Sequence, residues 1–410
     1  MIDVLANQTL FQRSQDIFSD FPWTIELYNP QGDVCILGKQ QKHWYPAPLQ
    51  IKLHSQAAVS DFLKLDAFSL IQRYLQSEVD FEGNFHLLPA IKAFVPVKLN
   101  LKQLFSSYLR NRYFQNITRA RKSVKSHYDI PQRLLEKYLD VRYMAYSCAM
   151  FEDAELTDTC LDLLKKSGEG EKDAFDSLEK AQWRKFKDAV DFLAPDPGET
   201  LLDVGCGYGG QLEVALASHP FGKVVGWTHS SNQAINGSKM LAAYPREQWE
   251  LNEGDYREDK RVFNHITSTG MISHVGPGGL TPYVKNIRKR IATGGRYLHH
   301  ALMADYSSTP LDQQVGVAFN KDYVWPGFHW FTLGEHMRTL EQNGFKVLRM
   351  QNLRAHYSKT ITAWYERFMQ HETEMREQMG EPTFRAWRLY LGGGASSYSG
   401  DVNRLYCVAI

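Results

Sequence analysis

A glycine-rich segment in the middle of the chain has residue types and spacing suited to a nucleotide-bearing cofactor. It runs Leu201-Leu202-Asp203-Val204-Gly205-Cys206-Gly207-Tyr208-Gly209-Gly210. The pattern predicts a β-strand that turns through glycines into a helix, where missing Cβ atoms let the backbone approach a ligand closely. Gly205, Gly207 and Gly210 satisfy the G-x-G-x-x-G pattern of dinucleotide-binding proteins. Gly205, Gly207 and Gly209 satisfy the tighter G-x-G-x-G of methyltransferases, so two classes remain open.

Two polar features favour S-adenosylmethionine over a nicotinamide dinucleotide. Asp203 stands directly before the glycines, where S-adenosylmethionine enzymes commonly place an acid near the methionine ammonium. Its alternative role is to accept hydrogen bonds from local amides. The end of the next predicted strand carries Thr228 and His229, where a nicotinamide enzyme usually places Asp or Glu for the ribose hydroxyls.

The elements that must position these residues alternate between strand and helix. Five segments read as strands, namely LLDVGCG, KVVGWTHS, WELNEGD, HITSTGM and RYLHHALM, and two more, FKVLRMQNL and RLYCVAI, follow near the end. Helices are expected over 173–193, 208–218 and 281–292, with a helical insertion over 363–391 between the last two strands. Such alternation predicts a largely parallel sheet. Ahead of it, LQIKLHS reads as a strand and 60–75 as a helix, separated from the later part by a basic stretch.

Composition narrows the class of protein. The chain has 410 residues, of which 43% are hydrophobic and 23% charged, and this is typical of a globular protein of two or three domains. Its formal net charge of +1 gives no global field that would attract nucleic acid.

Cysteine usage and the amino terminus indicate a cytoplasmic protein. The five cysteines are Cys35, Cys148, Cys160, Cys206 and Cys407. They form no C-x-x-C pair, so neither a metal site nor a disulfide framework is expected. The first residues lack the basic and apolar stretches of a secretory signal, and no apolar run approaches the ~20 residues that span a bilayer.

The basic stretch over 99–125 is both cationic and aromatic. Leu101, Phe105, Tyr108 and Leu109 recur at helical spacing. The positive charges come from Arg110, Arg112, Arg119, Arg121, Lys122 and Lys125. We expect either a solvated connector helix or a patch that binds anionic lipid headgroups, each cation contributing about 1 kcal/mol near such a surface.

Several separated motifs, taken together, resemble the cyclopropane fatty acid synthase family, which includes the mycolic acid methyltransferases. They are Ser126-His127-Tyr128-Asp129-Ile130-Pro131, Tyr143-Met144-Ala145-Tyr146-Ser147-Cys148-Ala149, the 203–210 loop, Val225-Gly226-Trp227-Thr228-His229-Ser230-Ser231-Asn232-Gln233, Gly254-Asp255-Tyr256-Arg257, Gly270-Met271-Ile272-Ser273-His274-Val275-Gly276-Pro277, His356-Tyr357 and Ala363-Trp364-Tyr365-Glu366-Arg367-Phe368. The resemblance runs from about residue 100 to the end and is weaker over the first hundred residues.

The resemblance implies an α/β fold, with a Rossmann-like seven-stranded class I methyltransferase domain behind a small α+β domain. The expected divisions are 1–98 for the small domain, 99–125 for a basic linker helix and 126–410 for the methyltransferase domain. Expected contacts to S-adenosylmethionine, with Asp203 among them, are Tyr146, Ser147, Gly205, Gly207, Thr228, His229, Gln233, Tyr256 and Gly270. The family also holds a bicarbonate ion thought to act as general base. Its expected cage is Cys148, His300, the backbone around Leu302, and Tyr357.

The sequence departs from the family pattern in three places. Ser273 stands where the family usually has a glutamate that helps to fix the bicarbonate, and a serine cannot carry that negative charge. Tyr208 replaces a usual tryptophan, and His229 replaces an aliphatic residue. The change at Ser273, which belongs to the expected catalytic set, bears on the product rather than on methyl transfer.

These features predict methyl transfer from S-adenosylmethionine to the double bond of an unsaturated acyl chain, in a phospholipid, through a carbocation. The expected place is the cytoplasm, at the inner membrane surface, and a homodimer is left open. Ser273 favours a methyl-branched or methylene product as the alternative to cyclopropane. N-methylation of a small amine and a cofactor-loaded lipid-binding protein without activity are more distant alternatives.

Overall fold

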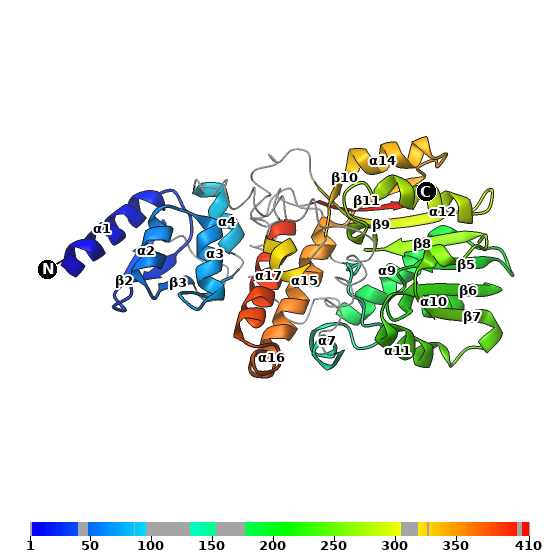
Figure 1. The fold of residues 1–410 in the computed structure, drawn as a ribbon, viewed down its shortest axis with the longest axis horizontal. Coiled ribbons are helices and arrows are strands. Elements are labelled where there is room, and N and C mark those ends of the chain that lie inside the picture. Colours follow the sequence, from blue (N-terminus) through cyan, green and yellow to red (C-terminus); the bar gives the residue numbers. More distant parts are fainter. Residues whose placement is uncertain are drawn as a thin grey trace.

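Two sheet-based domains lie at opposite ends of the molecule, with helices between them (Figure 1). The computed structural model describes residues 2–39, 48–85, 87–95, 132–152, 177–304, 319–325, 328–399 and 404–409. The predicted linker helix over 99–125 lies outside the described residues, and so do the two predicted domain boundaries at its ends.

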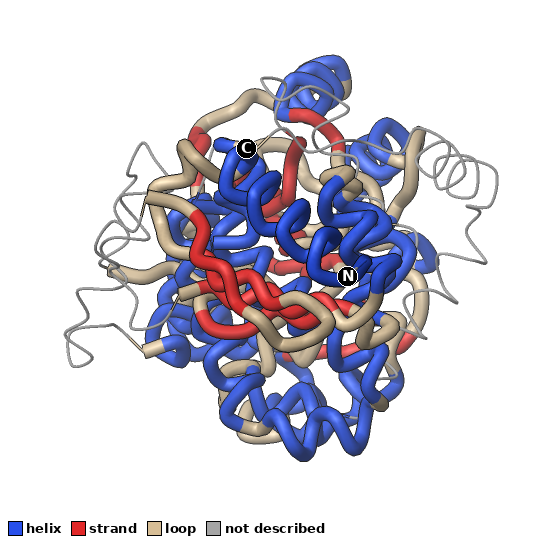
Figure 2. The backbone as a smooth tube through the Cα atoms, turned by 90° about the vertical axis from the view of Figure 1, so that its left-hand side faces the viewer, coloured by secondary structure: helices blue, strands red, loops and turns tan. Residues whose placement is uncertain are grey.

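The N-terminal domain combines helices with a four-stranded sheet in the order β2-β1-β3-β4. Its elements are α1 (Ile2–Ile17), β1 (Ile25–Tyr28), β2 (Val34–Leu37), β3 (Leu49–Leu53), α2 (Gln56–Leu63), α3 (Ala67–Leu75), β4 (Val79–Gly83) and α4 (Leu87–Phe94). Alternate residues of β1 and β3 are buried, as expected for strands with one face on a core. Figure 2 views this domain from its free end, with the strands in front of the viewer.

The larger domain contains a mostly parallel sheet in the order β11-β12-β9-β8-β5-β6-β7, and a short β10 pairs with β9. The strands are β5 (Thr200–Val204), β6 (Lys223–Thr228), β7 (Trp249–Glu253), β8 (His265–Thr269), β9 (Tyr297–Ala304), β10 (Phe331–Thr332), β11 (Arg349–Asn352) and β12 (Arg404–Ala409). Strand β12 runs antiparallel between β9 and β11. All seven predicted strands are present, and β10 is the addition.

Helices cover both faces of this sheet (Figure 1). They and the short turns are α7 (Gln132–Tyr138), α9 (Leu178–Leu193), α10 (Gly210–Ser218), α11 (Ser231–Leu241), η1 (Arg246–Gln248), η2 (Tyr256–Glu258), η3 (Ile272–His274), α12 (Leu280–Arg290), η4 (Asn320–Val324) and α14 (Leu333–Gln342). Leu201 packs in the core that includes α9 and α10, whereas its neighbour Leu202 packs in the core that includes α12 and α14. Neighbouring residues of one strand therefore serve opposite faces.

Three helices lie between the sheet and the N-terminal domain: α15 (Arg354–Gln370), α16 (Glu372–Met379) and α17 (Glu381–Ser399). They are the predicted insertion, but it is longer than the 363–391 expected. The predicted helix over 60–75 is also wrong in one respect, because α2 and α3 are separate. Leu65 between them has a φ of 56°, and that left-handed backbone ends a helix.

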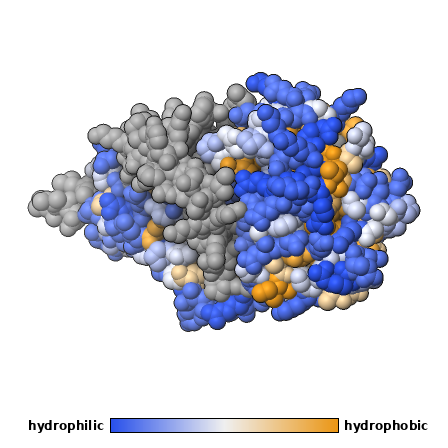
Figure 3. Space-filling model, turned by 45° about the vertical axis from the view of Figure 1, so that its right-hand side comes forward, coloured by the Kyte–Doolittle hydropathy of each residue, from blue (hydrophilic) through white to orange (hydrophobic). Residues whose placement is uncertain are grey.

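The outer face of the larger domain is mostly hydrophilic, with small separate hydrophobic patches (Figure 3). Among the residues that the structure describes, no helix is both long and apolar enough to cross a bilayer.

Candidate active site

The glycine-rich segment forms the turn between β5 and α10. Gly205, Gly207 and Gly209 have φ values of 78°, 55° and 85°, a left-handed backbone that side chains rarely adopt. The amides of Gly205 and Cys206 both donate to the carbonyl of Trp227, which ties the turn to β6. A Cβ added to Gly207 would meet no heavy atom within 4 Å. The turn therefore lies beside open space that a ligand can occupy.

Asp203 is buried beneath this turn, on the sheet face that carries α9. Its carboxylate accepts a hydrogen bond of 2.9 Å from the hydroxyl of Thr267 on β8. That bond comes from a side chain, so it differs from the capping of local amides that was the alternative for this residue. Burial raises the pKa of Asp203 to about 7, while the hydrogen bond from Thr267 and the charge of Lys185 oppose the shift. A positive group bound beside this carboxylate would restore its ionised form.

Other predicted cofactor contacts lie at the carboxyl ends of the neighbouring strands. The hydroxyl of Thr228 donates to the amide oxygen of Gln233 at 2.6 Å, so this predicted pair is in direct contact. His229 follows Thr228 and is half-buried, and Tyr256 lies on η2 with its ring against Tyr283. Beyond β8, Gly270 also has open space at its Cβ position. These positions follow the carboxyl edge of the sheet, where open α/β folds bind ligands.

The segment from Asp140 to Ala149 contributes both cofactor and catalytic candidates. The buried carboxylate of Asp140 accepts from the amides of Tyr143 and Ala145 at 2.7 and 2.8 Å. At its other end the amide of Ala149 donates to Thr360 Oγ1 on α15 at 3.0 Å. These bonds fix Tyr146, Ser147 and Cys148 between α9 and α15.

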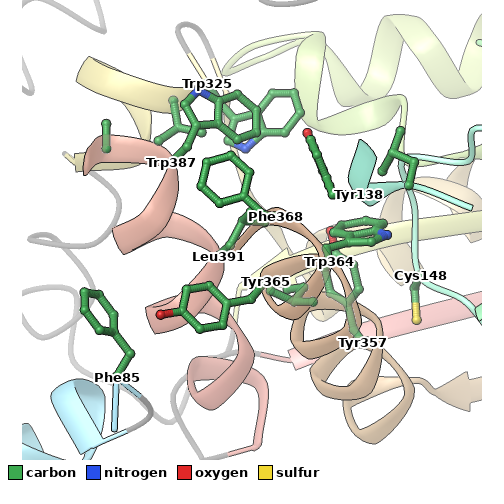
Figure 4. Close-up of a cluster of buried hydrophobic side chains, with 14 of the residues drawn as sticks. Phe85, Tyr138, Cys148, Trp325, Tyr357, Trp364, Tyr365, Phe368, Trp387 and Leu391 are labelled. Carbon is green, nitrogen blue, oxygen red and sulfur yellow. The ribbon is translucent and has the colours of Figure 1, made fainter. Parts of the chain in front are cut away.

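Cys148 and Tyr357 meet around one backbone carbonyl. The thiol of Cys148 lies 3.8 Å from the carbonyl oxygen of Leu353, and the amide of Tyr357 donates to the same oxygen at 2.9 Å. Both side chains are buried. Figure 4 shows Tyr357 on α15, with Cys148 beside that helix. Two members of the predicted cage are thus brought together although 209 positions separate them in the chain.

His300 lies on the same face of the sheet as Asp203. Asp203 pairs with Thr267, and Thr267 pairs with Leu298, two residues before His300. Among the described residues its ring makes no hydrogen bond. Burial first, and then the positive charge of Lys185, lower the pKa of His300 to about 3, so the imidazole is neutral. A neutral imidazole can donate or accept a proton in the site.

Ser273 lies on η3, which packs against β9. Its side chain is fully buried, and its hydroxyl has no hydrogen-bond partner among the residues that the structure describes. Its backbone carbonyl accepts from the amide of His329 at 2.8 Å. An orphaned buried hydroxyl is costly, and this polar atom is consistent with a site completed by a bound group.

An aromatic cluster adjoins the predicted cage. The rings of Tyr146 and Trp364 stack with centroids 4.9 Å apart and an interplanar angle of 4°. Tyr357 meets Trp364 edge-on at 6.1 Å, and Trp325 lies 5.2 Å from Tyr146. Figure 4 shows the cluster continuing through Phe368 and Trp387 toward α17. We call the rings of Tyr146, Trp325, Tyr357 and Trp364 the aromatic wall. The candidate site therefore has polar groups at the carboxyl edge of the strands and this apolar wall beside them.

The order of the strands, the antiparallel β12 and the glycine turn after β5 define a class I S-adenosylmethionine-dependent methyltransferase. The family model "Mycolic acid cyclopropane synthetase" matches residues 115–408. The chain belongs to this family.

Known proteins agree with this placement. A probable fatty acid methyltransferase of Mycobacterium tuberculosis is 27% identical over 339 residues, which are 82% of this chain and 72% of that protein. The cyclopropane-fatty-acyl-phospholipid synthase of Escherichia coli is 30% identical over 276 residues, which are 67% of this chain. The match spans 63% of that synthase, a little under two thirds of its length. The structure of the cyclopropane synthase MmaA2 from M. tuberculosis superposes with a TM-score of 0.62 and 24% identity, covering 70% of this chain and 97% of MmaA2.

Sequence reasoning missed three buried polar residues that organise the site: Asp140, Gln182 and Lys185. A signal for Lys185 was present. It stands four residues after Ala181 and four before Ala189, on the stripe of α9 that faces the core. A lysine in an apolar stripe needs a buried partner, and that requirement is the sequence signal for a functional role of Lys185.

Proposed function

We propose that the protein transfers a methyl group from S-adenosylmethionine to a double bond of an unsaturated acyl chain in a phospholipid. The observation that carries this proposal is the position of Cys148 and Tyr357 around the Leu353 carbonyl, with the ring of Tyr357 against the stacked pair of Tyr146 and Trp364. The names of the relatives, which act on fatty acids, mycolic acids and phospholipids, point to the same substrate class.

The chemistry makes use of both parts of the site. When bound, the cofactor supplies an electrophilic methyl group, and the carbon–sulfur bond breaks as a carbon–carbon bond forms at one alkene carbon. The other alkene carbon is left as a cation. Faces of Tyr146, Trp364 and Tyr357 can stabilise this cation, each by up to about 2 kcal/mol when water is excluded.

A base must then remove a proton. Loss of a proton from the new methyl group closes a cyclopropane ring, and loss from a neighbouring carbon leaves an olefin. Cys148, Tyr357, His300 and the backbone around Leu302 would supply polar groups that suit a small oxyanion. The hydroxyl of Ser273, which has no partner among the described residues, would add another donor. These residues would hold bicarbonate, which supplies a base when bound.

The second candidate product follows from Ser273. This residue offers a neutral hydroxyl where the family pattern that the sequence resembles usually has a glutamate, and charge-assisted hydrogen bonds are about twice as strong as neutral ones. A less firmly held base gives the cation time to lose a different proton. We therefore keep an olefinic chain, methyl-branched or methylene-bearing, as the alternative product.

Contact with the lipid surface is part of the proposal. The cationic stretch over 99–125, outside the described residues, would bind anionic headgroups through screened charge. Binding to anionic vesicles should weaken as salt rises and should fall when Arg119, Arg121 and Lys122 are neutralised. Equal binding to neutral vesicles would contradict this assignment.

The experiment that tests the function is mass spectrometry of the lipids of a host that expresses the chain, beside a host that expresses His300→Asn. We expect acyl chains to gain one CH₂ unit only with the unaltered protein, and fragmentation then locates the added carbon. Methylation of an amine without change in the acyl chains would replace this function by the N-methyltransferase alternative. Cofactor binding without any methylated product would favour the lipid-binding alternative.

A further inference from the structure

Lys185 is a charged residue on the buried stripe of α9. Only 5% of its surface is exposed, because it lies in the middle of α9 on the face that packs against the core. Taking an ammonium group out of water is costly unless hydrogen bonds and nearby charges compensate for it. The partners of this amine therefore indicate why a lysine is present.

Within the described residues, both hydrogen-bond partners of the Lys185 amine, Gln182 and Ser147, lie beside the candidate site. Its Nζ donates to Gln182 Oε1 at 2.6 Å and to Ser147 Oγ at 2.8 Å. The other end of the Gln182 amide, Nε2, donates to the carbonyl of Ser147 at 2.9 Å. Two residues of α9 thus bind the same serine.

The direction of these hydrogen bonds fixes what Ser147 can offer. An ammonium group has only donors, so the Ser147 oxygen must be the acceptor of that bond. The hydroxyl hydrogen must then point elsewhere, and among the described residues it has no acceptor. Ser147 is half-buried, which leaves this donor reachable. A donor backed by a positive charge suits an anionic acceptor such as a carboxylate.

Asp203 offers the opposite charge nearby. One oxygen of its carboxylate accepts from Thr267, and the group lies within electrostatic range of Lys185. Burial lowers the pKa of Lys185 to about 8, an effect that Asp140 opposes first and Cys148 and Asp203 after it, so the amine is mostly charged at neutral pH. The negative carboxylate of Asp203 is complementary to the ammonium of an amino acid, and the positive charge of Lys185 is complementary to its carboxylate.

We propose that Lys185 is a positioning residue, which acts through the hydroxyl of Ser147 to bind the carboxylate at the methionine end of the cofactor. Asp203 receives the ammonium of the same end. This inference rests on the proposed cofactor site and assigns within it a residue that touches no reacting atom. It predicts that Lys185 affects ligands that carry the amino-acid moiety and leaves others unaffected.

Two ligands that differ only in this moiety test the proposal. S-adenosylhomocysteine carries the amino acid, whereas 5′-methylthioadenosine keeps the adenosine and the thioether without it. We expect Lys185→Met to weaken S-adenosylhomocysteine binding by about tenfold or more in calorimetry, and to change methylthioadenosine binding less than about twofold. Ser147→Ala, which leaves the lysine in place, should show the same selective loss. Lys180→Met, an exposed lysine on the same helix, should change neither affinity.

The outcomes separate the two proposals. If the unaltered protein binds neither ligand, the cofactor assignment fails. If it binds both and Lys185→Met weakens both equally or neither, Lys185 has only a structural role and the inference is overturned. If Lys185→Met does not fold, Ser147→Ala decides, because unchanged selectivity in that variant excludes the relay.

Discussion

His299 and His300 are consecutive residues of β9 and both are buried, yet their surroundings differ. His299 faces α12 and α14, where Tyr283, Tyr297 and His336 complete a chain of hydrogen bonds. The bonds measure 2.9 Å from Tyr283 to Tyr297, 2.7 Å from Tyr297 to His299 and 3.1 Å from His299 to His336. His300 faces α9 and the candidate site, and no such bond engages its ring within the described residues.

The comparison shows that the position of a histidine along the strand, rather than its residue type, decides whether it can belong to the active site. Because successive side chains of β9 point to opposite faces of the sheet, a shift of one residue moves the side chain to the other face. On the α12 face both ring nitrogens of His299 are engaged, and the side chain contributes to stability. On the α9 face the ring of His300, which makes no hydrogen bond with the described residues, lies on the same side as Asp203 and Lys185.

The largest expected effect separates the two histidines by activity. His300→Asn should lower turnover by about 10²- to 10⁴-fold, the usual contribution of a group that moves or holds a proton. The melting temperature should change little, because no described hydrogen bond of the ring is lost. Methyl-transfer rates and thermal melting of purified protein measure both, and near-normal turnover would remove His300 from the site.

The converse prediction concerns stability. His299→Ala should lower the free energy of unfolding by about 3 kcal/mol, because Tyr297 and His336 both lose a buried partner. Turnover per folded molecule should stay within about twofold of the unaltered protein. Denaturant unfolding beside the rate of the folded fraction provides the measurement. A large loss of turnover without loss of stability would show that both faces serve catalysis.

On the open face, Gly207→Val should weaken S-adenosylhomocysteine binding by about 10- to 100-fold, since the new side chain would occupy the ligand's space. A left-handed φ also strains valine at this position. Gly198→Val is the matched control, because Gly198 has a φ of 88° and equally open space, but lies before β5. Calorimetry should find binding intact in the control, and equal losses in both variants would point to strain alone.

The raised pKa of Asp203 predicts that cofactor binding depends on pH. Below about pH 7 the free carboxyl is protonated, and binding an ammonium requires it to ionise. Affinity should therefore fall as pH decreases from 7 to 5, by at most about tenfold per unit, while Lys185 stays charged over this range. Asp203→Asn should flatten the curve, and an unchanged slope in that variant would assign the titration to another group.

The smallest expected effect is a change of product ratio at Ser273. Ser273→Glu introduces the carboxylate that the family pattern leads us to expect at this position, and we expect a larger share of cyclopropane among the products. Chromatography of the methylated acyl chains measures the ratio. An unaltered protein that makes cyclopropane alone, at a rate that the substitution does not change, would show that another group holds the base.

The sequence was a sufficient guide where a short pattern determines a local structure. The seven strands and the glycine turn followed from periodicity and from the backbone freedom of glycine. The hydrogen bonds of Gln182 and Lys185 to Ser147 could not be predicted in this way, because they depend on how α9 packs against a segment distant in the chain. The break at Leu65 was missed for a different reason, because helical spacing continues on both sides of it. The proposed site roles remain predictions for the experiments above.

Helix α17 belongs to two units that are far apart in the chain. On one side Arg385 donates to the carbonyls of Tyr74 and Val79 and pairs with Asp80, in the N-terminal domain. On another side Trp387 lies 6.4 Å from the ring of Tyr146 in the aromatic wall. The boundary of the first domain in space therefore does not coincide with any single cut in the chain. A chimera that exchanges the N-terminal domain between two relatives would have to carry the matching α17 with it.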